Sequence, residues 1–177
     1  MATSGLGYRP SHHDPGRPLS TRPPPVGPAG RERPLGRSDV TAKRGSARHA
    51  VRMAGPADDL WALLGAPERV PEWFPGIESC TVTGDQRVVL TRSGLPMPEQ
   101  LLTVDPTLRR LQYRITAPMF TEHLSTIDVH DLGDGTCLAV YSVDAAPAPL
   151  ALVILGAARA GLEGLPALLG LAVGAPA

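Results

Sequence analysis

The order of the predicted elements constrains the fold of this chain more than any other feature of its sequence. A short helix and a Trp-Phe-Pro-Gly break come first, a run of short strand segments follows, and one apolar helix lies near the C-terminus. Short strands joined by tight turns indicate an antiparallel meander and not parallel strand–helix–strand units. A long helix across a curled antiparallel sheet leaves a gap between the two layers. We therefore expect an α+β domain with space for a small apolar molecule.

The first helix has recognisable ends. Pro56 suits the first turn of a helix, and Asp58 and Asp59 follow where the helix dipole favours carboxylates. Gly65 is the predicted stop, and a second helical turn is expected over residues 68–73.

The C-terminal helix is predicted over residues 149–165, because apolar residues recur there at helical spacing. Pro166 is expected to end or kink it, and Gly156, Gly161 and Gly164 are expected to permit a close approach to the sheet. The predicted buried stripe is Leu152, Leu155, Ala158, Leu162 and Leu165.

Seven segments have the length and composition of strands. Gly133-Asp134-Gly135 joins the last two and is a strong hairpin signal, since glycine adopts positive φ without strain. The predicted strands occupy residues 47–53, 77–82, 87–92, 100–104, 110–117, 122–129 and 136–143.

Bulk composition excludes several functional classes. Lys+Arg and Asp+Glu are balanced at 17 each, so no global field favours nucleic acid, and we expect no specific nucleic-acid partner. Cys80 and Cys137 lack neighbours at metal-ligand spacing, which predicts buried free thiols in a reducing compartment and no metal site. The sequence shows no nucleotide-binding motif and no secretory signal, so we expect no cofactor and a cytoplasmic location.

Residues 1–45 differ from the rest of the chain. This segment is rich in proline and arginine and poor in apolar side chains, so we expect a disordered arm. Such a basic segment could adhere weakly to phosphate polymers, or it could be only a solvated leader or an over-extended gene start.

The apolar stretch over residues 150–173 is long enough to cross a membrane. Arg159, Glu163 and Pro166 oppose a membrane span, and the preceding strands require a covering helix. We therefore expect a helix packed on the sheet, with a tail anchor as the alternative.

Five segments in order carry a family resemblance. They are residues 59–64 (Asp-Leu-Trp-Ala-Leu-Leu), 72–77 (Glu-Trp-Phe-Pro-Gly-Ile), 110–115, 133–136 and 160–165. Their order and spacing resemble the START/Bet v1-like (SRPBCC) helix-grip superfamily, of the polyketide cyclase/dehydrase and lipid-transport type. The resemblance implies a curved, seven-stranded antiparallel sheet wrapped around a long C-terminal helix, with two short helices after the first strand. It also implies a ligand-binding domain over residues 46–170 and a flexible tail over residues 171–177.

The segment Ser93-Gly94-Leu95-Pro96 is similar to the gate loop of plant hormone receptors in this superfamily. The resemblance implies a lid over residues 93–97, and an ordinary β-turn is the alternative. Phe74 and Pro118 stand where those receptors have a hormone-anchoring lysine and a latch histidine. A more apolar ligand is therefore implied.

The resemblance also sets which strand positions face inward. The expected inward residues are Val89, Thr91, Glu99, Leu101, Thr103, Leu111, Tyr113, Ile115, His123, Ser125, Ile127, Val129, Cys137, Ala139, Tyr141 and Val143. The predicted ligand-binding residues are Phe74, Val89, Thr91, Leu95, Pro96, Glu99, Leu101, Tyr113, Ile115, His123, Ser125, Ile127, Tyr141, Leu155 and Leu162.

The predicted function is binding of a small hydrophobic, lipid-like or polyketide-like molecule between the sheet and the last helix. The alternatives are a cyclase/aromatase with Glu99, His123 and Tyr141 as candidate acid–base groups, or an assembly factor that holds a protein segment. Glu99 could instead form a rim salt bridge with Arg92 or Arg114. His123 could be a hydrogen-bonded residue at a strand end, and the tyrosines could pack with solvated hydroxyl groups.

Overall fold

The computed structural model of the protein describes residues 44–171. The predicted arm over residues 1–45 and the predicted tail over residues 171–177 therefore lie almost wholly outside the described residues.

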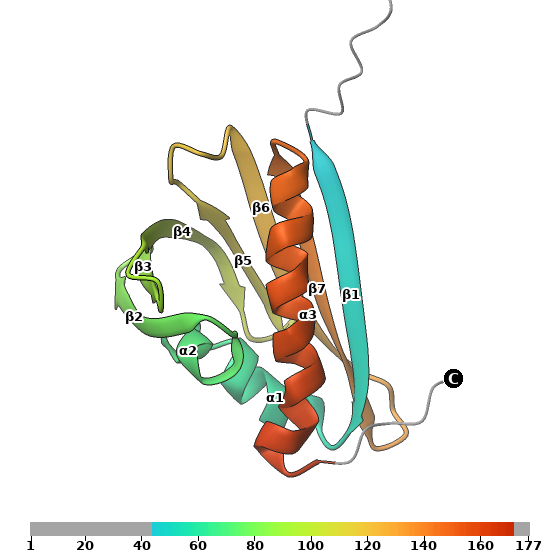
Figure 1. Cartoon of the computed structure of the whole chain (residues 1–177). Helices are drawn as coiled ribbons and strands as arrows, with labels where there is room; N and C mark the ends of the chain where they lie inside the picture. The colour runs from blue at the N-terminus through green and yellow to red at the C-terminus, as the bar shows by residue number, and fades with distance from the viewer. Residues whose placement is uncertain (1–43, 172–177) are drawn as a thin grey trace, which may run out of the picture. The chain divides into compact units, whose positions relative to one another are not determined.

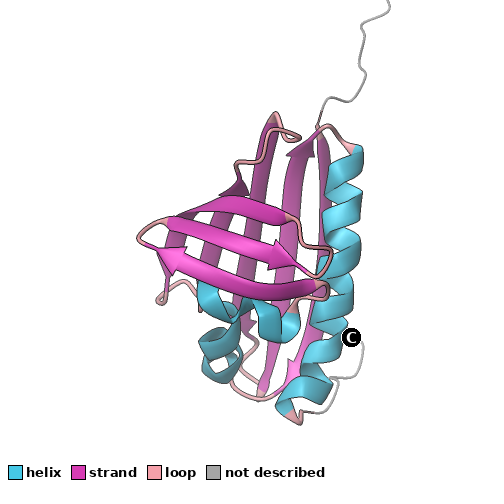
Figure 2. Cartoon of the chain, turned by 60° about the vertical axis from the view of Figure 1, so that its left-hand side comes forward, coloured by secondary structure: helices cyan, strands magenta, loops and turns pink. Residues whose placement is uncertain are grey.

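The described part of the chain contains one antiparallel sheet of seven strands in the order β1-β7-β6-β5-β4-β3-β2. The sheet curls, so that β2, β3 and β4 run across the direction of β1, β7 and β6 (Figures 1 and 2). Helix α3 lies along β1 and β7, while α1 and α2 lie at one end of the molecule's sheet (Figure 1). The strands are β1 (Gly45–Ala54), β2 (Ile77–Thr83), β3 (Gln86–Thr91), β4 (Pro96–Asp105), β5 (Arg110–Ile115), β6 (Glu122–Asp131) and β7 (Thr136–Ala146), and the helices are α1 (Ala57–Leu64), a 3-10 turn (Pro67–Arg69), α2 (Val70–Trp73) and α3 (Pro149–Leu169).

This architecture confirms the predicted fold class. The long C-terminal helix, the two short helices after the first strand and the curved seven-stranded antiparallel sheet are all present. The predicted strand alternation also agrees with burial, because Val89, Leu111, Ile127 and Val143 are each buried in the core.

Thr103 is an exception, and a β-bulge explains why. The register of β4 against β5 shifts between Leu101 and Thr103, so that Leu101 pairs with Tyr113 and Thr103 pairs with Gln112. Thr103 Oγ1 donates to Gln112 Oε1 at 3.1 Å on the outer face. The prediction that Thr103 faces inward is wrong, because one extra residue in a strand inverts the side-chain alternation beyond it.

The prediction that Pro166 ends α3 is wrong, and so is the burial predicted for Leu152, whereas a kink at Pro166 stays a prediction. The helix continues through Pro166 to Leu169, and its C-cap is Gly170, whose φ is +65°. Pro166 is itself buried, and its carbonyl accepts the Leu171 N–H at 2.7 Å. Leu152 is 68% exposed, because Ala151, two turns before Ala158, is the residue that faces the sheet at that level.

Of the three glycines expected to permit a close approach of α3 to the sheet, only Gly161 lies close to a neighbouring backbone, and that backbone belongs to α2. A Cβ placed on Gly161 would lie 2.6 Å from the Trp73 carbonyl oxygen, whereas Gly156 and Gly164 have no such neighbour. By length and composition alone, α3 could cross a membrane. In this fold its Ala158, Leu162 and Leu165 are completely buried, so packing accounts for one apolar face of the helix.

Candidate functional site

A cavity of about 290 Å³ lies between the curled part of the sheet and the N-terminal half of α3. Its walls come from five parts of the chain: the loop after α2, strands β2 to β5, the β3–β4 turn, the β5–β6 loop and α3. The lining residues are Phe74, Pro75, Gly76, Ile77, Val89, Thr91, Leu95, Met97, Glu99, Tyr113, Ile115, Met119, Phe120, Leu150, Val153, Ile154 and Ala157.

About half of the predicted ligand-binding residues line this cavity, namely Phe74, Val89, Thr91, Leu95, Glu99, Tyr113 and Ile115. The others lie outside its lining, and their ligand-binding role stays a prediction. Pro96 is exposed because it alternates with the inward-facing Met97 on β4. Ile127 and Leu162 are buried in the core beneath the cavity, and Leu101 and Leu155 pack against that core. His123, Ser125 and Tyr141 form a polar cluster behind the cavity wall.

The mouth of the cavity is apolar. Leu95, Met119 and Val153 each line the cavity and are 47–68% exposed. They come from the β3–β4 turn, the β5–β6 loop and α3. A hydrophobic molecule could therefore enter without removing water from charged groups.

The predicted lid is a tight turn in the structure. Residues 92–95 join β3 to β4, and Gly94 has a φ of +80°. Thr91 braces the turn, since its Oγ1 donates to the Leu95 carbonyl at 3.0 Å and accepts the Leu95 N–H at 3.0 Å. Pro96 and Met97 belong to β4, so the loop is shorter than the predicted residues 93–97. Closure of this turn over a ligand stays a prediction.

Glu99 forms a buried ion pair at the inner end of the cavity. Arg87 Nε donates to Glu99 Oε2 at 2.6 Å, and the two side chains are 2% and 7% exposed. Arg87 also donates to the Pro67 carbonyl at 3.1 Å and lies over the Tyr113 ring. Neither Arg92 nor Arg114, the partners expected for a rim salt bridge, pairs with Glu99.

The correct partner was available from the strand pattern. Arg87 has the same parity as Val89 and Thr91, which were assigned inward, and β3–β4 pairing places Arg87 directly opposite Glu99. Burial raises the pKa of the Glu99 carboxyl above its usual value, and the positive charge of Arg87 counteracts that increase.

Four side chains form a hydrogen-bonded chain behind the cavity. Tyr113 and Tyr141 hydroxyl oxygens lie 2.7 Å apart, and Ser125 Oγ lies 2.9 Å from the Tyr141 hydroxyl. Ser125 Oγ is also 3.1 Å from His123 Nε2. Tyr113 is the member that lines the cavity, whereas the ring of Tyr141 packs behind Phe74, with centroids 6.3 Å apart. The Tyr141 hydroxyl group is therefore buried and not solvated, contrary to the alternative considered from the sequence.

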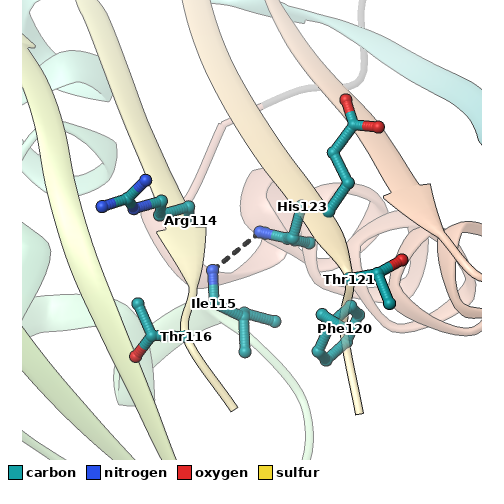
Figure 3. A pocket seen from close by; sticks show the side chains of 7 residues that line it. Arg114, Ile115, Thr116, Phe120, Thr121 and His123 are labelled. Carbon is teal, nitrogen blue, oxygen red and sulfur yellow. Dashed lines mark hydrogen bonds between the residues drawn. The ribbon is translucent and has the colours of Figure 1, made fainter. Parts of the chain in front are cut away.

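His123 lines a separate groove of about 280 Å³ between the end of β5 and the start of β6 (Figure 3). Its Nδ1 accepts the Ile115 backbone N–H at 2.8 Å, which Figure 3 marks with a dashed line. Burial lowers the pKa of His123 from 6.5 to about 4, so the imidazole is neutral at physiological pH. Both ring nitrogens are engaged, as expected for a hydrogen-bonded histidine at a strand end.

Metal-ligating side chains do not gather in the part of the chain that the structure describes, where no group of three His, Cys, Asp or Glu residues could hold a metal ion. Cys80 and Cys137 are both free thiols.

A curled antiparallel sheet that grips a C-terminal helix around an apolar cavity defines the helix-grip class of the START/Bet v1-like superfamily. Comparison with protein-family models identifies the family: residues 44–170 match the polyketide cyclase/dehydrase and lipid transport family. The chain belongs to this family, as its sequence resemblance implied. A comparison with curated proteins finds no match.

Solved structures support the same class. The protein XoxI from Bacillus cereus is 26% identical, with a TM-score of 0.65, and the match covers 71% of this chain and 96% of that one. A START superfamily protein from Mycobacterium smegmatis is 17% identical (TM-score 0.55; 70% and 93% covered). Norcoclaurine synthase from Thalictrum flavum is 19% identical (TM-score 0.56; 73% and 89% covered). The last two show a shared fold alone.

Proposed function

We propose that this protein binds one small hydrophobic molecule, lipid-like or polyketide-like, in the cavity between the sheet and α3. The observation that carries the proposal is the cavity itself: its lining is apolar except for Thr91, Glu99 and Tyr113. Ligand sites of this kind combine mostly apolar walls with a few placed polar groups. The family description, polyketide cyclase/dehydrase and lipid transport, supports the same class of ligand. We also propose a cytoplasmic location, which the two free thiols favour.

Native mass spectrometry of freshly purified protein tests this proposal. We expect a small apolar molecule to co-purify with the wild-type chain, and Ala157→Trp to abolish its retention by filling the cavity. Ala160→Trp is the matched control, because Ala160 is exposed on the same helix and does not line the cavity. Retention of the same molecule by Ala157→Trp would contradict the proposed site, and a bound polypeptide instead of a small molecule would favour an assembly factor.

A cyclase-type enzyme is the second candidate, and Glu99 is the residue that favours it. A buried carboxyl group with a raised pKa beside Tyr113 could transfer a proton to or from a bound ligand. His123 and Tyr141, the other candidate groups, lie outside the cavity lining. If the co-purified molecule is converted by the protein, we expect Glu99→Gln to slow conversion while retaining binding. An equal rate of conversion in Glu99→Gln would contradict a catalytic role for this residue.

A further inference from the structure

In the hydrogen-bonded chain behind the cavity, the position of the proton on the neutral His123 ring is determined by its contacts. Because His123 Nδ1 accepts the Ile115 N–H, the neutral imidazole must carry its proton on Nε2. That N–H is directed at Ser125 Oγ, 3.1 Å away, so Ser125 is an acceptor for His123. A proton on Nδ1 would face the Ile115 N–H, so that two donors would meet without an acceptor. The direction of the first hydrogen bond is therefore determined.

The remaining members of the chain contain one hydroxyl hydrogen too many. Ser125, Tyr141 and Tyr113 each contribute one O–H hydrogen, and two hydrogen bonds, of 2.7 and 2.9 Å, join their three oxygen atoms. These two hydrogen bonds use two of the three hydrogens, so one hydroxyl hydrogen is left for a further acceptor.

Burial decides which hydroxyl group keeps that free hydrogen. Ser125 and Tyr141 are completely buried and do not line the cavity, so a free hydrogen on either would be a buried donor without an acceptor. Tyr113 lines the cavity, where a bound molecule can supply the acceptor. The favoured arrangement is therefore donation from Ser125 to Tyr141 and from Tyr141 to Tyr113, with the Tyr113 O–H left as a donor for a ligand.

Glu99 determines which ligand charge is compatible with the cavity. One of its oxygen atoms, Oε2, is engaged by Arg87, and the described residues provide no donor to the other, Oε1. Glu99 lines the cavity, whereas Arg87 does not. A carboxylate or phosphate group on a ligand would thus meet a negative carboxylate before it met the guanidinium, which is unfavourable in a poorly hydrated site. The lining favours neutral ligands.

We propose that the ligand is a neutral, largely apolar molecule with a carbonyl-type oxygen that accepts a hydrogen bond from Tyr113, which makes Tyr113 a specificity-determining residue. This inference rests on the proposed function, because it names the chemical class of ligand for the same cavity. The hydrogen-bonded chain acts as a positioning device: Ser125 and Tyr141 direct the Tyr113 hydrogen toward the cavity.

Calorimetric titration of the full chain with three naphthalenes of similar size tests this inference. The probes are 2-acetylnaphthalene, which has a carbonyl oxygen, 2-ethylnaphthalene, which lacks it, and the anion 2-naphthoate. We expect the ratio of the ethyl Kd to the acetyl Kd to be about tenfold larger for the wild type than for Tyr113→Phe, as the loss of one hydrogen bond to a neutral acceptor predicts. Naphthoate should bind most weakly. The difference in water solubility between the two neutral probes cancels when this ratio is compared between the wild type and Tyr113→Phe.

Thr103→Val is the matched control. Thr103 lies on the outer face of β4 and outside the cavity lining, and its hydroxyl donates to Gln112 Oε1, so its removal should leave the ratio of the ethyl Kd to the acetyl Kd unchanged. An unchanged ratio in Tyr113→Phe would overturn this inference while leaving the proposed function intact. Binding of none of the three probes would overturn the proposed function and the inference with it.

Infrared spectroscopy of bound 2-acetylnaphthalene decides the matter if Tyr113→Phe does not fold. In the wild type we expect the carbonyl stretching frequency to fall below its value in an alkane solvent, because a donated hydrogen bond weakens the C=O bond. A frequency equal to the alkane value would overturn the inference.

Discussion

At the scale of single residues, the Arg87–Glu99 pair is the most unusual feature of the described chain. Two charged side chains lie almost completely out of water, opposite each other on neighbouring strands. Removing charges from water is costly, and their mutual attraction offsets this cost only while both partners are present. The pair also holds Glu99 against the cavity and Arg87 over the Tyr113 ring. Its integrity therefore affects both stability and the shape of the site.

Removal of one partner should be much more damaging than removal of both. We expect Glu99→Ala to lower the free energy of unfolding by about 3–5 kcal/mol, since it leaves Arg87 buried without a counter-charge. The double variant Arg87→Met/Glu99→Leu should recover most of this loss, because apolar side chains of similar volume need no partner. Urea unfolding of the wild type, Glu99→Ala and the double variant measures their free energies of unfolding. A double variant as unstable as Glu99→Ala would show that the charges are not the cause.

His123 should make stability depend on pH. In the unfolded chain it takes up a proton near pH 6.5, whereas in the folded chain burial delays protonation to about pH 4. Between these values the unfolded state binds more protons, so stability is present above pH 6.5 and is lost as pH falls toward 4, by up to about 3 kcal/mol.

His123→Asn removes this titration but keeps a side-chain acceptor for the Ile115 N–H. We therefore expect a flatter profile of unfolding free energy between pH 7 and pH 4.5 for this variant. Parallel profiles for the two proteins would mean that His123 is not the group responsible.

At the scale of elements, α3 shows that glycine positions in one helix have different roles. Gly161 lies against the Trp73 carbonyl of α2, whereas Gly156 is exposed with no neighbour near its Cβ direction. The close approach holds α3 against the short helix that begins the cavity wall. The same substitution at the two positions should thus have opposite effects.

Gly161→Ala should destabilise the protein, because its methyl group would require α2 and α3 to separate. Gly156→Ala should stabilise it by up to about 1 kcal/mol, the usual difference in helix propensity between alanine and glycine. Thermal unfolding of both variants measures these changes: we expect the Tm to fall for Gly161→Ala and to rise for Gly156→Ala. Stabilisation by Gly161→Ala would show that the contact between the helices is loose.

Elements fixed by interactions between residues close in the sequence could be predicted, and those fixed by distant residues could not. The antiparallel meander and the hairpin at Gly133 depend on local turns and alternation, and the structure confirms both predictions. Pro166 is predicted to end or kink α3, but the helix continues past it to a C-cap at Gly170. The burial of Pro166 is a tertiary effect, and the cap lies downstream in the sequence, so the local pattern around Pro166 reports neither. Thr103 was misplaced because the bulge depends on pairing with β5.

The candidate site could likewise be predicted only as far as local sequence patterns determine it. Alternation groups the strand residues into two faces, and the family resemblance identified the face that lines the cavity, as at Val89 and Tyr113. The pairing of Arg87 with Glu99 required the hairpin register, which the short β3–β4 turn fixes. The separation of His123 from Glu99 depends on how far the sheet curls, and no local pattern in the sequence reports that curvature.

At the scale of the whole molecule, the curl of the sheet and the path of α3 together create the cavity. The C-terminal half of α3 fills the space above β1 and β7 with Leu162 and Leu165, whereas the N-terminal half presents Val153, Ile154 and Ala157 to the cavity. The C-terminal half of α3 thus completes the core, and its N-terminal half forms one wall of the cavity. A bound apolar molecule would extend the core into that cavity, and we expect it to stabilise the folded state in proportion to its occupancy.

Intermolecular nuclear Overhauser effects between a bound ligand and assigned methyl groups test the central claim most directly. With 2-acetylnaphthalene as the ligand, we predict contacts to the methyl groups of Val89 and Ile154, which line the cavity, and none to Leu168, which is exposed near the far end of α3. Contacts to Leu168 with none to Val89 and Ile154 would place the ligand on the outer surface of α3 and would contradict binding between the sheet and the helix.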